Sequence, residues 1–203
     1  MAKNETGVMD VAEETAAEDE PSGAVPATPT ESIDAALAAK AEGNARFLHA
    51  DYDGAIDLYS QAIELVGDDC DERATFYANR AACHAKLGEH ELVVDDCSSA
   101  IALRPDYAKA LHRRAAAREA LGECEGALQD MKRVVELEPS NQSAVSSLPR
   151  LDAAAKAKLE QQKEEMMGKL KDLGNSVLGR FGMSLDNFKA VQDPGTGSYN
   201  ISF

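Results

Sequence analysis

The sequence predicts an all-α protein built from three stacked helical hairpins, followed by a long helix that covers the third hairpin. Two observations predict this fold. The 203-residue chain is rich in Ala, Leu, Glu and Lys, which are residues that favour helices. Its central part repeats with a period of 34 residues, which is typical of arrays of stacked hairpins. The pairs that show this period are Ala81 and Ala115, Gly88 and Gly122, Asp96 and Asp130, and Pro105 and Pro139.

The N-terminal segment, residues 1–30, is predicted to be a disordered acidic tail. It contains seven acidic residues against the single Lys3, followed by three prolines. Such a segment cannot bury enough apolar surface to offset its chain entropy. It is interpreted either as a solubilising tail or as a regulatory, partner-binding arm.

Residues 31–141 contain the three predicted repeats, at about 36–69, 74–107 and 108–141. Each repeat reads as a helix, a short turn, a second helix and a closing turn, and Pro marks the closing turn in the second and third copies. A short polar insertion at residues 70–73 separates the first copy from the second. Positions within a repeat are counted here from Ala36, Ala74 and Ala108.

These repeats resemble the tetratricopeptide repeat (TPR) family. The residues at its signature positions are Gly43, Tyr59, Ala62, Ala81, Ala100, Pro105, Ala115, Ala127 and Pro139. The resemblance covers about residues 36–141. It implies a right-handed solenoid with a concave groove lined by the first helix of each hairpin, because stacking covers the apolar face that one hairpin leaves exposed.

Residues 142–174 are predicted to form a capping helix, and residues 175–203 a C-terminal tail. Pro149 is expected to mark a kink or a restart of the helix. A coiled-coil contact with a partner is the alternative role of this helix. The tail is apolar and alternates in the manner of a strand over residues 198–203, so it is interpreted as folding back onto the helix or as a second docking motif. Residues 166–175 and this tail resemble the C-terminal part of one TPR sub-family.

Composition limits the possible functions. The net charge of −15 argues against a nucleic-acid partner, and no apolar run approaches the roughly 20 residues of a membrane span. The N-terminus carries no signal or transit pattern, so a cytosolic or nuclear protein is expected, with the cytoplasm as the predicted location. The chain is also expected to be a monomer. The four cysteines lack metal-ligand spacing and are expected to be mostly buried apolar residues: Cys70, Cys83, Cys97 and Cys124. No phosphate loop or nucleophile motif is present, so neither an enzyme nor a cofactor is expected.

One face of the first helix of each repeat carries cations and amides but no carboxylate. Positions 2, 5, 6, 9 and 13 fall on this face at about 100° per residue. Its polar members are Lys40, Asn44, Thr75, Asn79, Lys86, Lys109, His112 and Arg113. Positions 1, 4 and 8 fall on a separate face, which is predicted to pack inside the array: Ala36, Ala39, Gly43, Ala74, Tyr77, Ala81, Ala108, Leu111 and Ala115.

The face matches the carboxylate clamp of chaperone-binding TPR domains, in which Lys and Asn residues of the first, third and fifth helices, with an Arg, hold a peptide terminus. The matching residues are Lys40, Asn44, Asn79, Lys109 and Arg113, with Phe47, Ala82, Ala85 and Lys86 as weaker candidates. The resemblance implies a co-chaperone or adaptor that binds the Glu-Glu-Val-Asp terminus of Hsp70 or Hsp90. Lys109 and Arg113 are expected to be exposed. The remaining basic candidates are interpreted as structural or solvent-facing: His49, His84, His90, His112 and Arg114.

A second function remains open on the sequence alone. The chain is alternatively interpreted as a scaffold for a signalling partner, for example a GTPase-pathway protein, bound through the capping helix and tail.

Overall fold

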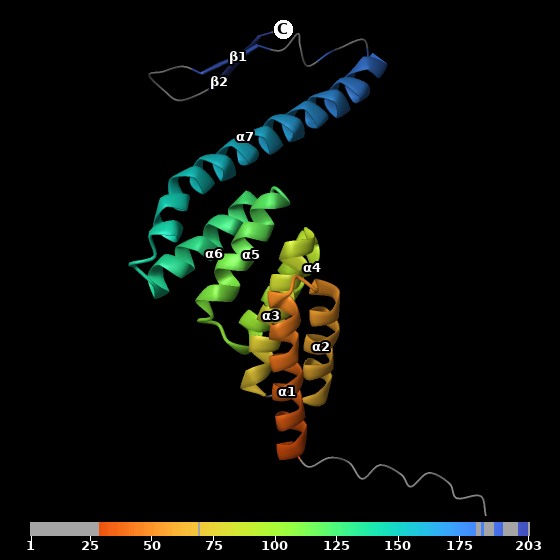
Figure 1. Cartoon of the computed structure of the whole chain (residues 1–203). Coiled ribbons are helices and arrows are strands. Elements are labelled where there is room, and N and C mark those ends of the chain that lie inside the picture. The colour runs from red at the N-terminus through yellow and green to blue at the C-terminus, as the bar shows by residue number, and fades with distance from the viewer. Residues whose placement is uncertain (1–28, 69, 182–183, 185–188, 193–198, 203) are drawn as a thin grey trace, which may run out of the picture.

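The structure is a computed structural model that describes residues 29–68, 70–181, 184, 189–192 and 199–202 (Figure 1). Nearly all of the predicted acidic tail therefore lies outside the described residues. Within them, seven helices follow one another along the chain. They are α1 (Pro29–Leu48), α2 (Tyr52–Leu65), α3 (Asp71–Leu87), α4 (His90–Leu103), α5 (Ala108–Ala120), α6 (Cys124–Leu137) and α7 (Gln142–Leu178).

The helices form the predicted stack of three hairpins. Hairpin 1 is α1–α2, hairpin 2 is α3–α4 and hairpin 3 is α5–α6, and each helix packs against the next along the chain (Figure 1). The first helices of hairpins 2 and 3 also contact each other directly. The all-α solenoid expected from the 34-residue period is therefore confirmed.

The turn inside each hairpin needs a residue in the left-handed region. Gly88 and Gly122, one period apart, adopt φ angles of 80° and 74° there. Glycine enters this region without a Cβ penalty, and it ends α3 and α5 at the predicted place. Hairpin 1 has Ala50 at the equivalent position, with a φ of 59°.

The positions predicted to pack are inside the array. Seven of the nine are buried and the other two, Tyr77 and Ala108, are half-buried. Apolar clusters follow the stack, one between hairpins 1 and 2, one between hairpins 2 and 3, and one beneath α7. The small residues keep the helices close: a Cβ on Gly43 would lie 2.9 Å from Cε1 of Tyr59.

Helix α7 covers hairpin 3 with its first turns and then continues away from the stack (Figure 1). Asn141 caps it, because its side chain accepts a hydrogen bond from the Ala144 amide at 3.1 Å. Ala144 and Leu151 are buried in the cluster of hairpin 3. Pro149 lies inside this continuous helix rather than ending it, and α7 reaches Leu178, beyond the expected end at residue 174. None of the described helices has the length and apolarity needed to cross a membrane.

A 3₁₀ turn, η1 (Gly179–Phe181), follows α7, and the tail then contains two short strands. Strand β1 (Lys189–Gln192) pairs antiparallel with β2 (Tyr199–Ser202), with Lys189 opposite Ser202. The alternation over residues 198–203 correctly indicated β2, whereas β1 was not predicted. This two-stranded sheet is the exception to an otherwise helical architecture among the described residues.

Candidate functional site

A small hollow joins the first helices of the three hairpins. Its volume is about 200 Å³. It is lined by Asn44, Phe47, Tyr59, Asn79, Ala82 and Arg113. The structure therefore brings together five residues of the predicted site that lie far apart in the sequence, and adds Tyr59 from α2.

The Asn44 side chain is fixed in this hollow by its neighbours. Its Oδ1 atom accepts a hydrogen bond from the Tyr59 hydroxyl at 2.8 Å and one from Nδ2 of Asn79 at 3.3 Å. Both bonds use the carbonyl end of the amide, and within the described residues its Nδ2 group makes no hydrogen bond. An Asn amide has two N–H donors on that nitrogen, so Asn44 can donate to a bound acceptor.

Tyr59 was missed as a site residue by the sequence reasoning. It occupies position 24 of hairpin 1, a signature packing position, and its ring lies against Gly43 in the core. Only the hydroxyl reaches the hollow, where it meets Asn44. Burial raises the pKa of this phenol to about 12, so it remains a hydrogen-bond donor at neutral pH.

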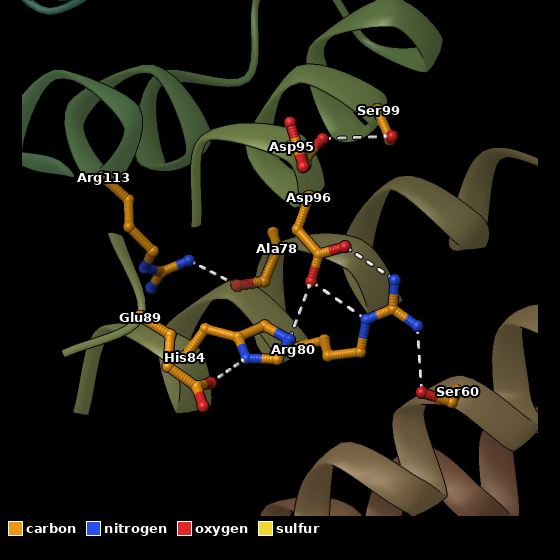
Figure 2. A network of polar contacts seen from close by, with 9 residues as sticks. All are labelled: Ser60, Ala78, Arg80, His84, Glu89, Asp95, Asp96, Ser99 and Arg113. Carbon is orange, nitrogen blue, oxygen red and sulfur yellow. Dashed lines mark hydrogen bonds and ion pairs between the residues drawn. The ribbon is translucent and has the colours of Figure 1, made fainter. Parts of the chain in front are cut away.

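The Arg113 side chain is positioned by the backbone of hairpin 2. Its Nη1 atom donates to the backbone carbonyl of Ala78 in α3, and the residue is half-buried (Figure 2). The prediction that Arg113 is exposed is therefore wrong, because the backbone of the preceding hairpin passes within its reach. An arginine carries five N–H donors in a planar fork, so one bond to α3 positions the group and leaves others for an anion.

A larger hollow of about 540 Å³ lies between hairpin 3 and the start of α7. It is lined by Ala108, Lys109, His112, Arg113, Ala116, Glu138, Asn141 and Ser143. Arg113 borders both hollows, so the two hollows together are called the groove here. Lys109 is exposed there as predicted. His112, interpreted from the sequence as structural or solvent-facing, is half-buried in the wall of the larger hollow.

The larger hollow also contains a carboxylate. Glu138, in the turn that ends hairpin 3, accepts a hydrogen bond from Nδ2 of Asn141 at 3.0 Å. The sequence predicted a groove face without carboxylates, and this is correct only for the part of the groove that the first helices form. The prediction missed Glu138 because this residue enters from the turn before α7.

Three predicted site residues lie apart from both hollows. Lys40 is half-buried on α1 and lines neither of them. Ala85 and Lys86 are exposed in the last turn of α3 and also line neither. The geometry therefore places six of the nine predicted site residues in the two hollows: Asn44, Phe47, Asn79, Ala82, Lys109 and Arg113.

A polar network also holds neighbouring hairpins together (Figure 2). Arg80 donates to both oxygens of Asp96, at 2.9 and 2.7 Å, and to Ser60 of hairpin 1 at 2.9 Å. His84 lies between Glu89 and Asp96, at 2.6 and 3.7 Å. The structural roles expected of His84 and Arg114 are confirmed, because Arg114 makes the equivalent contacts to Asp130 and Ser98.

Two of the four cysteines are buried in the array. Cys83 and Cys97 are buried, and burial raises the pKa of their thiols to about 11 and about 12. The thiol rather than the nucleophilic thiolate is the form present at neutral pH. Cys70 and Cys124 are only half-buried, unlike the expectation for all four. Among the described residues, no cluster of His, Cys, Asp and Glu could hold a metal ion.

The repeats are similar to proteins of known architecture. A stretch of 127 residues, 63% of this chain, is 40% identical to protein unc-45 homolog B of Homo sapiens. The solved structure of the first TPR of Spaghetti (RPAP3), bound to the HSP90 peptide SRMEEVD, is 36% identical. That match covers 61% of this chain and 94% of the solved domain, with a TM-score of 0.56. The chain belongs to the tetratricopeptide repeat family.

A second TPR structure is also similar. It is the second TPR domain of human RPAP3 in complex with the HSP70 peptide SGPTIEEVD, at 34% identity and a TM-score of 0.53. The match covers 62% of this chain and 98% of that domain. No protein-family model matches the chain. The TPR segment spans only 14% of the unc-45 homolog and 34% of the small glutamine-rich TPR protein 2 of Saccharomyces cerevisiae.

Proposed function

We propose that this chain is a non-enzymatic adaptor whose TPR groove binds the acidic C-terminal peptide of Hsp70 or Hsp90. The observation that carries the proposal is the small hollow, where amides from hairpins 1 and 2 meet Arg113 of hairpin 3. Similar TPR domains were solved with peptides that end Glu-Glu-Val-Asp.

The chemistry of the hollow suits a peptide terminus. A C-terminal Asp presents two carboxylates within a few ångströms. Hydrogen bonds from charged donors to carboxylates are roughly twice as strong as bonds between neutral groups. Asn44, Asn79 and Arg113 would hold the terminal carboxylate, and Lys109 would face the acidic groups of the peptide along the larger hollow. The apolar walls, Phe47 and Ala82, would contact the Val side chain.

Calorimetric titration tests the proposal with two peptides of the same sequence. We expect the peptide with a native carboxyl terminus to bind with a Kd on the order of micromolar, equivalent to about −8 kcal/mol. Added salt should weaken this binding, since exposed charges are screened. Equal affinity for the peptide with an amidated C-terminus would contradict the proposal.

Variants of hairpin 3 locate the binding surface. Lys109→Glu places a negative charge beside the peptide and should reduce affinity at least about tenfold, since a bond to a charged group contributes roughly 1.5–3 kcal/mol. Lys132→Glu is the matched control, because Lys132 is an exposed lysine of α6 that lines neither hollow. Arg113→Lys should also weaken binding, since it keeps the charge but loses the planar fork.

Tyr59→Phe tests the support beneath Asn44. The variant keeps the buried ring but removes the hydroxyl that bonds to Oδ1 of Asn44. We expect roughly 2–10-fold weaker peptide binding, equivalent to about 0.5–1.5 kcal/mol for one hydrogen bond. In an Asn44→Ala background the same change should have no further effect. Additive losses in the two backgrounds would mean that Tyr59 acts through general packing.

The remaining partner and location predictions are unchanged by the structure. They are the cytoplasmic location, the absence of nucleic-acid and membrane partners, and the signalling scaffold. Deleting residues 174–203 tests the scaffold, since loss of such a partner with peptide binding intact would assign that role to the end of the chain. The preference between Hsp70 and Hsp90 follows from titrating both tail peptides.

A further inference from the structure

The distal part of α7 carries an apolar strip that is exposed in the structure. Five large apolar side chains, each at least half exposed, form what is called here the α7 strip: Leu159, Met166, Leu170, Leu173 and Val177. Large apolar side chains gathered on one exposed face mark an interaction surface. The first turns of α7 pack on hairpin 3, so capping alone does not explain this second apolar face.

The spacing of the strip is that of a coiled coil. Successive members are separated by 7, 4, 3 and 4 residues, which places them on one face at the a and d positions of a heptad. The seven-residue step from Leu159 to Met166 skips one a position of the heptad, and Lys163 occupies it. The strip is therefore a helix–helix seam about 27 Å long at 1.5 Å per residue, with one charged position.

We propose that the α7 strip pairs with the α7 strip of a second copy of this chain, with the two helices antiparallel. Antiparallel pairing joins each a position to a d position of the partner helix. If the two helices cross at Gly168, Leu159 meets Val177 and Met166 meets Leu170, each pair occurring twice. Lys163 meets Leu173 in the remaining two layers. Every layer of the seam is thereby filled by a side chain of the strip or by Lys163.

The charges beside the strip favour this orientation. Residues 159–166 contain three glutamates and one lysine, whereas residues 167–178 contain two lysines and one aspartate. An antiparallel pair places the acidic half of one helix along the basic half of the other. Lys163, at an a position, then lies opposite Leu173 rather than opposite Lys163 of the other copy. A parallel pair would place like charges together, which is unfavourable.

The stack prepares α7 for this contact. Its N-terminus is capped by Asn141, and Leu151 is 1% exposed beneath it, so the helix is already nucleated before a partner arrives. Nucleation is the costly step in forming a helix, and two-helix seams of this length are marginal when both helices must form first. The proposal departs from the monomer expected from the sequence, and it does not depend on the proposed peptide site.

Sedimentation equilibrium of the full chain over a concentration series tests the pairing. We expect the mass to rise with concentration toward twice the 21.7 kDa of one chain. Leu170→Lys puts a charge into the two central layers and should keep the chain monomeric. Leu92→Lys is the matched control, since Leu92 is an exposed leucine of α4, and it should associate like the original chain. Circular dichroism should show equal helix content in both variants.

A charge comparison at position 173 tests the orientation. Leu173→Glu should associate more strongly than Leu173→Lys, because position 173 faces Lys163 of the other copy in an antiparallel pair, whereas in a parallel pair it would face itself. Lys163→Leu should strengthen association, since it removes the one polar residue at an a position. Equal association of Leu173→Glu and Leu173→Lys would overturn the antiparallel arrangement.

Two further outcomes would overturn the pairing itself. The first is a full chain that stays monomeric at every concentration, or a dimer that Leu170→Lys leaves unchanged. The second is a monomer that associates only when the chain is shortened to end at Leu178, which would assign the strip to the chain's own tail. A different protein that binds the strip while the chain itself stays monomeric would likewise overturn the pairing.

Discussion

Hairpin 1 differs from hairpins 2 and 3 at positions where those two agree. Position 7 is Arg80 in hairpin 2 and Arg114 in hairpin 3, and position 23 is Asp96 or Asp130. Each arginine bonds to the aspartate of its own hairpin and to a serine of the hairpin before it. Hairpin 1 has Glu42 and Leu58 at these two positions, so it contains neither partner of the pair.

The difference follows from position in the array. Among the described residues no hairpin precedes hairpin 1, so an arginine at its position 7 would have no serine to reach. Its Arg46 instead pairs with Glu42 and Asp51 at the surface, at 3.4 and 3.0 Å. Each buried pair therefore joins the two helices of its own hairpin and, through the serine, joins that hairpin to the one before it.

Two other positions separate hairpin 1 from its neighbours. Position 8 is Gly43, opposite Tyr59, whereas the other hairpins combine Ala81 with Cys97 and Ala115 with Met131. A larger side chain at position 24 thus comes with a smaller one at position 8. The tyrosine in turn supplies the hydroxyl that bonds to Asn44 in the candidate site. The residues that distinguish hairpin 1 therefore contribute to the groove, whereas the residues that hairpins 2 and 3 share contribute to the junctions between hairpins.

The largest effect should come from removing a carboxylate of the buried pairs. Asp130→Ala leaves Arg114 and Arg118 without the group that both contact at 2.7 Å. We expect a loss of about 3–5 kcal/mol in the free energy of unfolding, since an unmatched buried charge is costly. Glu42→Ala in hairpin 1 should cost about 0.2–1 kcal/mol because its pair is exposed. Urea denaturation measures the free energy of unfolding of both variants. Equal losses would contradict the difference between hairpin 1 and the other two hairpins.

A smaller effect should follow from enlarging position 8 of hairpin 1. Gly43→Ala places a Cβ 2.9 Å from the Tyr59 ring, and overpacking of this kind costs roughly 1–3 kcal/mol. Ala favours a helix over Gly by about 1 kcal/mol, which offsets part of the loss. The double variant Gly43→Ala/Tyr59→Met reproduces the pair of hairpin 3. It should be more stable than the sum of the two single changes predicts, as measured by thermal unfolding.

The turn of hairpin 1 should respond in the opposite direction. Ala50 adopts the left-handed conformation that the other two turns give to glycine. Ala50→Gly should therefore raise the free energy of unfolding by about 0.5–1 kcal/mol, because it relieves the Cβ penalty of that conformation. Gly88→Ala should lower it by a similar or greater amount. A destabilised Ala50→Gly protein would show that another interaction holds this turn.

The last effect appears only at alkaline pH. Burial raises the pKa of Tyr59 from 10.0 to about 12. As the pH rises from 10 to 12, the unfolded chain loses a proton that the folded chain keeps, so stability falls over this range and is unaffected below it. Tyr59→Phe should therefore show a shallower loss in urea titrations between pH 10 and 12. Cys83 and Cys97 contribute in the same direction in both proteins, so the difference isolates position 24 of hairpin 1.

The repeat pattern predicted the fold because stacking depends on residues that recur one period apart. The small residues at positions 1, 4 and 8 fall inside the array for that reason. The same period also carried a signal that was not used: Arg80 and Arg114 recur with the same spacing as Asp96 and Asp130. Reading the two sets together would have indicated the buried pairs.

The details of the site depend on contacts between hairpins. The periodicity of a single helix shows which face a residue lies on, but it does not show which residues of another hairpin that face meets. The partial burial of Arg113 comes from the α3 backbone, and Glu138 enters from the turn before α7. Tyr59 was assigned to packing because most of its side chain does pack there. The end of α7 was placed too early because Gly174 and Asn175 were interpreted as a break, whereas a helix tolerates one glycine at about 1 kcal/mol.

The serine contacts of Arg80 and Arg114 set an order of opening for the array. Each arginine joins two adjacent hairpins, so these contacts tie α2 to α3 and α4 to α5, whereas none of them reaches α1. Repeat arrays open locally, with a free energy that depends on nearest neighbours. Backbone amides of α1 should therefore exchange with deuterated solvent before those of α4 and α5, and the groove would loosen first at its α1 edge.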